Sequence, residues 1–206
     1  MSRKLIDSLK PLETSKTQIR AQVRDSLRRI PVEERRLASA RSCDLLQSRI
    51  EWRNARSVLF YAPLADELDL SPLWRIGLSE GKIVALPRFS RKANEYVACA
   101  IANLKDSLPN GKFGIPEPGA DSRQIPLNQL DLVMVPGVAY DLSGRRVGRG
   151  RGFYDRMLAN VRGTKCGVAF EQQILGEVPV EPHDVRLDCL LTPTRWICCG
   201  QSSALK

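Results

Sequence analysis

The sequence predicts an α/β domain with a mostly parallel central sheet, and two patterns support this fold class. Short apolar segments typical of buried strands alternate with segments whose apolar residues recur every three or four positions. Such alternation is typical of parallel strands joined by helices. With 206 residues and 43% hydrophobic content, the chain can form one substantial core. We expect a single three-layer domain over 15–200, flanked by an extension over 1–14 and a tail over 201–206.

The amino-terminal region predicts two helices. Ser15 and Gln18 form a capping box, and apolar residues follow at helical spacing, so a helix is expected over 16–29. Pro31 ends this helix. The same proline suits the first turn of a second helix, where two glutamates follow near the positive helix end.

The sheet and its helices are predicted from the middle of the chain onward. A short helix has Ser71 as its cap, Pro72 at its first position and Gly81 after its end. Residues 90–130, rich in short polar segments, Pro and Gly, predict a small β excursion or flap. Buried strands are expected over 58–61, 82–86, 96–102, 132–135, 165–170 and 188–191.

The most informative segment is 144–158, which reads Gly-Arg-Arg-Val-Gly-Arg-Gly-Arg-Gly-Phe-Tyr-Asp-Arg-Met-Leu. Five arginines accompany one carboxylate, Asp155, and three alternating glycines leave backbone N–H groups open to a ligand. Guanidinium groups bind phosphate bidentately, and the start of the helix that follows adds free N–H groups. We call 144–158 the phosphate cradle. It matches neither the G-x-G-x-x-G fingerprint nor a P-loop.

Two other interpretations of the cradle remain open. An Arg-Gly run can be a disordered tail that binds nucleic acid, although such tails are repetitive and this run is single. It can also be a solvated turn, for which five arginines against one acid would be an unusual charge load. Phe153, Tyr154, Met157 and Leu158 follow at helical spacing, which favours an ordered segment.

Charge and cysteine content narrow the function classes. The net charge is +9, and residues 1–60 hold 14 basic against 7 acidic side chains, so anionic partners are expected. The six cysteines form no C-x-x-C pair, which predicts buried, reduced thiols in a cytoplasmic protein. Because the chain has one histidine, we do not expect a zinc site or a catalytic triad that depends on histidine. No apolar run approaches the roughly 20 residues of a membrane span, so we expect no membrane partner.

Charged residues outside the cradle offer further candidates. Asp155 and Asp188 would suit Mg²⁺ if both reach a bound phosphate, whereas Asp155 alone also suits a helix start or a pair with nearby Arg156. Lys16 and Arg20 lie one helical turn apart and can close on a phosphate tail, or they form an exposed basic face. Glu67 follows a strand and can accept from an N–H-rich ligand or pair with the basic amino-terminal region.

Several motifs recur in the order of a known family. They are Tyr-Ala-Pro-Leu-Ala-Asp-Glu-Leu-Asp (61–69), Leu-Pro-Arg (86–88), Gly-Ile-Pro-Glu-Pro (114–118), Val-Pro-Gly-Val-Ala-Tyr-Asp (135–141), the phosphate cradle, and Asp188 before Leu-Leu-Thr. Over about Lys16 to Thr192 the chain resembles the 5-formyltetrahydrofolate cyclo-ligase family. The resemblance implies an enzyme that uses Mg-ATP to close 5-formyltetrahydrofolate into 5,10-methenyltetrahydrofolate, with release of ADP and phosphate. It implies that ATP phosphorylates the formyl oxygen and that N10 then attacks the activated carbon.

The same resemblance implies roles for individual residues. ATP would be bound by Lys16, Arg20, Arg146, Val147, Gly148, Arg149, Gly150, Arg151, Gly152, Phe153 and Tyr154. The folate would contact Ala62, Glu67, Arg149, Gly150, Arg151, Gly152 and Phe153. Mg²⁺ would be held by Asp155 and Asp188. Arg146 and Arg149 are expected to stabilise charge on the transferred phosphoryl group. Leu70 and Phe153 stand where the family usually has Thr and Tyr.

Two alternative functions remain at this stage. The basic amino-terminal helix would also suit an RNA-associated binding module, although 6% aromatic content and the lack of nucleic-acid motifs count against it. A related ATP-dependent ligase or kinase that acts on another small acid would keep the cradle and change the pterin pocket. We expect a monomer whose partners are 5-formyltetrahydrofolate and ATP, and not nucleic acid.

Overall fold

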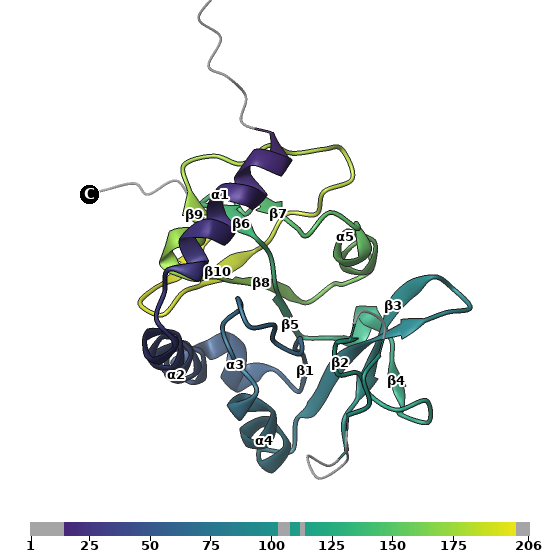
Figure 1. Ribbon diagram of the computed structural model, residues 1–206. Helices are drawn as coiled ribbons and strands as arrows, with labels where there is room; N and C mark the ends of the chain where they lie inside the picture. Colours follow the sequence, from purple (N-terminus) through teal and green to yellow (C-terminus); the bar gives the residue numbers. More distant parts are fainter. Residues whose placement is uncertain (1–14, 103–107, 112–113, 201–206) are drawn as a thin grey trace, which may run out of the picture.

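Two sheets form the framework of the protein (Figure 1). The larger sheet has the strand order β11-β10-β8-β5-β1-β2-β3-β4, and the smaller one has the order β7-β6-β9. The computed structural model describes residues 15–102, 108–111 and 114–200. The predicted extension over 1–14 and the tail over 201–206 therefore lie outside the described residues.

The larger sheet is mostly parallel, as the sequence predicted. Strands β1, β2, β5, β8 and β10 run parallel to one another, whereas β3, β4 and β11 are added antiparallel at the two edges. The predicted β excursion is the antiparallel edge of this same sheet, because β3 pairs with β2 over Ala85–Ser90. The strands are β1 (Ser57–Leu59), β2 (Ile83–Ser90), β3 (Glu95–Ala100), β4 (Gln124–Ile125), β5 (Leu132–Val135), β8 (Thr164–Val168), β10 (Cys189–Leu191) and β11 (Trp196–Cys198).

Helices cover both faces of this sheet, which gives the predicted three layers. Helices α2, α3 and α4 lie on one side and α5 on the other (Figure 1). The strands are apolar on both faces: Leu132 and Met134 of β5 join one core cluster, and Val133 and Val135 join the other. The helices are α1 (Lys16–Arg28), α2 (Val32–Ser48), α3 (Ile50–Asn54), α4 (Pro72–Ser79) and α5 (Phe153–Leu158).

Helix starts follow the sequence signals with one difference. The capping box of α1 is present between Ser15 and Gln18, and Pro31 lies at the N-cap position of α2. Ser71 lies at the N-cap position of α4, but its side chain makes no capping bond because its backbone is already helical. Its backbone N–H instead donates to Asp69 Oδ1 at 2.8 Å.

The smaller sheet was not predicted. It consists of β6 (Ala139–Asp141), β7 (Arg146–Val147) and β9 (Ile174–Leu175). Strands of two or three residues are too short to show alternation in a sequence. The sheet contacts α1 through β6 and β7, so it supports the helix that carries Lys16.

Cysteine burial follows the prediction in part. Cys43, Cys99, Cys166 and Cys189 are buried, Cys198 is exposed and Cys199 is half-buried, and all six thiols are free. Within the described part of the chain, no helix has the length and apolar character needed to cross a bilayer.

Asp131 fixes the start of the two central strands. Its Oδ2 accepts from the backbone N–H groups of Arg56 and Ser57 and from the Ser57 hydroxyl, each at 2.9 Å. The carbonyl oxygen of Gln129, 2.8 Å from the Ser57 hydroxyl, is an alternative acceptor for its single hydrogen. One carboxylate therefore joins the chain before β5 to the beginning of β1.

Replacing Asp131 with Ala should destabilise the fold, because the backbone N–H groups of Arg56 and Ser57 lose their shared acceptor. We expect the free energy of unfolding to fall by about 2 kcal/mol, measured by urea denaturation. Asp121→Ala, at an exposed turn, is the matched control and should leave the midpoint unchanged. Equal midpoints for both variants would contradict this account.

Candidate functional site

A cavity of about 470 Å³ opens where two central parallel strands end. Tyr61 and Ala62 follow β1, and Pro136 and Gly137 follow β5, so both pairs lie at the carboxyl edge of the sheet. Ligands of open α/β sheets bind at this edge, as the sequence analysis expected. The phosphate cradle crosses the cavity between β7 and α5.

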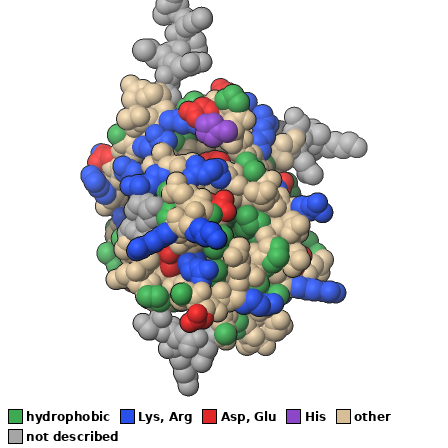
Figure 2. All heavy atoms as spheres, turned by 90° about the vertical axis from the view of Figure 1, so that its right-hand side faces the viewer, with side chains coloured by type: hydrophobic (Ala, Val, Ile, Leu, Met, Phe, Trp, Pro, Cys, Tyr) green, Lys and Arg blue, Asp and Glu red, His purple; other side chains and the backbone are tan. Residues whose placement is uncertain are grey.

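The cavity collects basic, acidic and aromatic side chains from distant parts of the sequence. Figure 2 shows the side of the molecule on which α5 lies, where Lys and Arg side chains gather with acidic side chains among them. The lining residues are Lys16, Arg20, Tyr61, Ala62, Leu64, Glu67, Pro87, Tyr96, Ile115, Pro116, Glu117, Pro136, Gly137, Arg146, Gly148, Arg149, Gly150, Arg151, Gly152, Phe153, Tyr154, Asp155, Glu181, His183 and Asp184.

Helix α1 contributes two cations to the cavity. Lys16 Nζ donates to Asp184 Oδ2 at 2.7 Å, and Arg20 Nε donates to the carbonyl of Gly148 at 2.8 Å. The Lys16 side chain is 17% exposed. These two residues therefore belong to the cavity and do not form an exposed basic face.

Arg146 and Asp155 form a buried ion pair at the base of the cradle. Arg146 Nη2 lies 2.6 Å from Asp155 Oδ1, and the two side chains are 4% and 14% exposed. Arg146 Nη1 also donates to the carbonyl of Pro136 at 3.3 Å, and the guanidinium lies 5.9 Å from the ring centroid of Tyr154. Asp155 thus holds Arg146 in place, whereas the sequence had suggested Arg156 as its partner.

Glycines 150 and 152 give the cradle its path. Gly150 has φ 100° and Gly152 has φ 62°, a region that side-chain-bearing residues rarely adopt. Gly152 is also the N-cap residue of α5. The sharp turn brings the backbone of 148–152 to the cavity wall without intervening side chains at the glycines.

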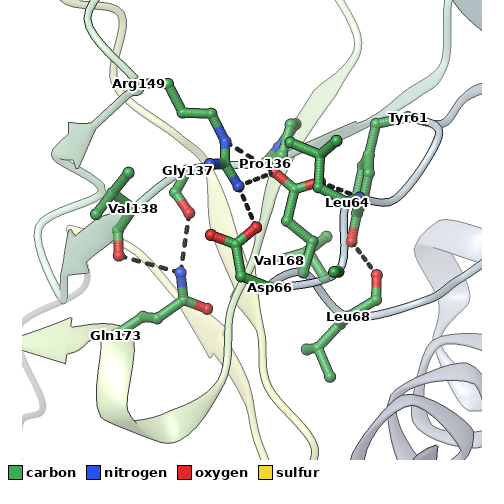
Figure 3. A network of polar contacts seen from close by, with 12 residues as sticks. Tyr61, Leu64, Asp66, Leu68, Pro136, Gly137, Val138, Arg149, Val168 and Gln173 are labelled. Atoms are coloured by element: carbon green, nitrogen blue, oxygen red, sulfur yellow. Dashed lines mark hydrogen bonds and ion pairs between the residues drawn. The ribbon is translucent and has the colours of Figure 1, made fainter. Parts of the chain in front are cut away.

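Arg149 pairs with two acids across the cavity (Figure 3). Its Nη2 lies 2.6 Å from Asp66 Oδ1 and 2.9 Å from Glu67 Oε1, and its Nε donates to the same Glu67 oxygen at 3.2 Å. Glu67 Oε2 accepts from the Leu64 N–H at 2.9 Å. Burial raises the pKa of the Glu67 carboxyl above its ordinary value, although Arg149 and the Leu64 N–H act in the opposite direction.

Aromatic rings line the opposite part of the cavity. Phe153 lies 5.4 Å from Tyr96 and 5.5 Å from Phe89, centroid to centroid, and all three contacts of the trio are edge-to-face. Phe153 stands where the family usually has Tyr, so a ring on the cavity wall lacks a hydroxyl group. Leu70, which stands where the family usually has Thr, does not affect the cavity, because it is 1% exposed and belongs to the core.

Two predicted site residues do not line the cavity. The Val147 side chain is fully buried in the core and its backbone pairs within the smaller sheet. Asp188 lies just before β10, at the amino end of the parallel strands, where its Oδ2 accepts from the Lys165 N–H at 2.7 Å. Asp155 and Asp188 are therefore not brought together as two ligands of one ion.

The structure adds cavity residues that sequence reasoning missed. Glu181, His183 and Asp184 come from a loop and lie beside Lys16, with ligand atoms within 4.8 Å of one another. No motif marked this loop, and only the single histidine would have directed attention to it. Glu117 was noticed as part of a motif, but its position in the cavity follows from tertiary contacts alone.

Comparisons with known proteins agree with the geometry. The model of the 5-formyltetrahydrofolate cyclo-ligase family matches residues 12–193. The chain is 27% identical to a 5-formyltetrahydrofolate cyclo-ligase of Mus musculus, with 87% of this chain and 94% of that protein covered. It is 33% identical to the Escherichia coli enzyme of the same name over 68% of this chain and 80% of that one. The solved 5,10-methenyltetrahydrofolate synthetase of Aquifex aeolicus superposes with a TM-score of 0.81 at 32% identity, covering 93% of this chain and 96% of that one. The chain belongs to the 5-formyltetrahydrofolate cyclo-ligase family.

Proposed function

We propose that this protein converts 5-formyltetrahydrofolate to 5,10-methenyltetrahydrofolate with hydrolysis of ATP to ADP and phosphate. The observation that carries the proposal is one cavity with two chemically different ends. One end presents Lys16, Arg20 and Arg146, and the other presents the aromatic rings of Tyr96 and Phe153. The first suits a polyphosphate and the second suits a flat heterocycle.

The phosphates of ATP would lie against the cations and the glycine-rich backbone of the cradle. Lys16 and Arg20 reach them from α1, and Gly148, Gly150 and Gly152 leave the chain close to the ligand. Arg151, Phe153 and Tyr154 complete the proposed nucleotide contacts. The proposal does not include the side chain of Val147, because it is buried in the core.

Mg²⁺ fits the donor set of the cavity through Asp155. One oxygen of this carboxylate holds Arg146, which leaves the other to join phosphate oxygens in the way that Mg²⁺ usually binds. The ion would neutralise phosphate charge. Asp188 is not proposed as a ligand, because it lies at the opposite edge of the parallel strands.

The reaction needs positioning and charge neutralisation. The formyl oxygen attacks the γ-phosphorus of ATP, and the bond from that phosphorus to ADP breaks. N10 then attacks the formyl carbon, the carbon–oxygen bond breaks as phosphate leaves, and N10 loses its proton. Arg146 and Arg149 would stabilise the phosphoryl group during transfer. No cysteine is among the described cavity residues, which agrees with a route that needs no thiol nucleophile.

The folate would occupy the side of the cavity nearer β1 and β3. We propose that Ala62 and the loop from Arg149 to Phe153 contact it and that Glu67 accepts a hydrogen bond from the pterin. Arg149 lies between the two ligands in this arrangement, since it pairs with Glu67 and belongs to the cradle.

The direct test is to mix the protein with 5-formyltetrahydrofolate and Mg-ATP and to follow the near-ultraviolet absorbance of the methenyl product. We expect growth of that signal only when ATP is present. Binding of both ligands without product would contradict the proposal and would point to a relative that acts on another substrate.

Replacing Arg149 with Ala should lower kcat by about a hundredfold, because a preorganised cation is lost beside the transferred phosphoryl group. Steady-state kinetics with both substrates saturating would measure this. Arg162→Ala, at an exposed arginine outside the cavity, serves as the matched control and should retain wild-type kcat. An Arg149→Ala enzyme with wild-type turnover would remove Arg149 from the mechanism.

The pH dependence of kcat/KM for the folate should reflect the raised pKa of the Glu67 carboxyl. As the pH falls through this pKa, the carboxylate gains a proton and weakens its pairing with Arg149 and its hold on the folate. We expect the acid limb of kcat/KM for the folate to lie above the ordinary pKa of glutamate. The limb should be absent in Glu67→Gln, with an enzyme-free blank at each pH. Persistence of the same limb in that variant would assign it to another group.

A further inference from the structure

The cavity contains a second buried glutamate to which the roles above assign nothing. Glu117, in the motif Gly-Ile-Pro-Glu-Pro, is 5% exposed and lines the cavity. Its Oε2 accepts from the Phe89 N–H at 2.9 Å. Its Oε1 is buried and has no hydrogen-bond partner among the described residues. An acceptor buried without a partner is costly, so such an oxygen in a cavity wall indicates a ligand.

The surrounding chain holds this carboxylate in place. The Glu117 N–H donates to Pro109 O at 3.0 Å, and Arg88 Nη1 donates to Gly119 O at 2.8 Å. Gly111 provides the space: a Cβ built there would lie 2.1 Å from the Glu117 Cδ and 2.4 Å from Oε2. The position of the carboxyl group therefore depends on the absence of a side chain at residue 111.

The neighbours of Glu117 define the chemistry of its ligand. Tyr96, Ile115, Pro116 and Phe153 line the cavity with it, so the carboxylate lies among apolar and aromatic groups. Such surroundings suit a flat ring that carries an N–H group on its edge. Glu67 differs from Glu117 in this respect, because each of its two oxygens already has a partner within the chain.

We propose that Glu117 is a folate-binding residue whose Oε1 accepts a hydrogen bond from an N–H group of the pterin ring. The inference rests on the proposed function for the identity of the ligand. A purely structural role would use only Oε2, which holds the end of β2 through Phe89. Glutamine can make that bond equally well with its carbonyl oxygen, but it turns an amide N–H₂ group toward the pterin instead of an acceptor.

The test is Glu117→Gln, with affinity for 5-formyltetrahydrofolate and for Mg-ATP measured separately by calorimetry. We expect the folate Kd to rise by about tenfold or more, as for a lost charge-assisted hydrogen bond, while the Kd of Mg-ATP and the unfolding midpoint stay unchanged. Glu95→Gln, at an exposed position of β3 outside the cavity, removes the same charge and should leave the folate Kd unchanged. Gly111→Ala should raise the folate Kd as well, because its methyl group displaces the carboxyl group.

Three outcomes would overturn the inference. A wild-type folate Kd in Glu117→Gln would mean that Oε1 does not contact the ligand. A parallel loss of folate affinity, ATP affinity and unfolding midpoint would assign Glu117 a structural role only. A wild-type protein that neither binds nor converts 5-formyltetrahydrofolate would reject the proposed function and this inference with it, whereas an active wild type with an unaffected variant would reject the inference alone.

Discussion

The buried ion pair between Arg146 and Asp155 organises the site. A guanidinium that is only 4% exposed requires a compensating charge, and Asp155 supplies it from α5 at 2.6 Å. The pair joins β7 to α5, and Arg146 also donates to Pro136 at the end of β5. Both ends of the glycine loop are therefore fixed to the sheet edge. The loop between them can follow an unusual path because its glycines permit it and its ends do not move independently.

Each cation at the phosphate end already has an oxygen partner within the chain. Lys16 pairs with Asp184 and Arg146 pairs with Asp155, whereas Arg20 donates to the backbone carbonyl of Gly148. An incoming polyphosphate therefore has to replace oxygen partners that these cations already have. Exchange reduces the net gain in affinity, since broken pairs offset new ones. It also disfavours small anions that cannot replace several partners at once, which is a source of selectivity.

The sequence predicted elements whose signals are local and missed those that depend on assembly. The capping box at Ser15 and the apolar segment Leu132–Val135 were confirmed because caps and buried strands leave direct patterns. The smaller sheet left none. Asp188 was expected to share Mg²⁺ with Asp155 because both are carboxylates and the family resemblance implied it, although strand direction places Asp188 at the other edge. Glu117 was noted only as part of a sequence motif, and its role could not be predicted because its contact with Phe89 depends on the tertiary structure.

The contact between Lys16 and Asp184 spans 168 positions of the sequence. During synthesis, Lys16 emerges long before its partner, by roughly 10 to 30 seconds at ordinary translation rates. The cavity therefore cannot be assembled progressively on the ribosome, even though α1 contains its own start signal and can form early. Binding of a ligand in the cavity therefore requires that nearly the whole described chain has been synthesised and folded. A nascent protein arrested before the loop that carries Asp184 would have much of the sheet but not the finished site.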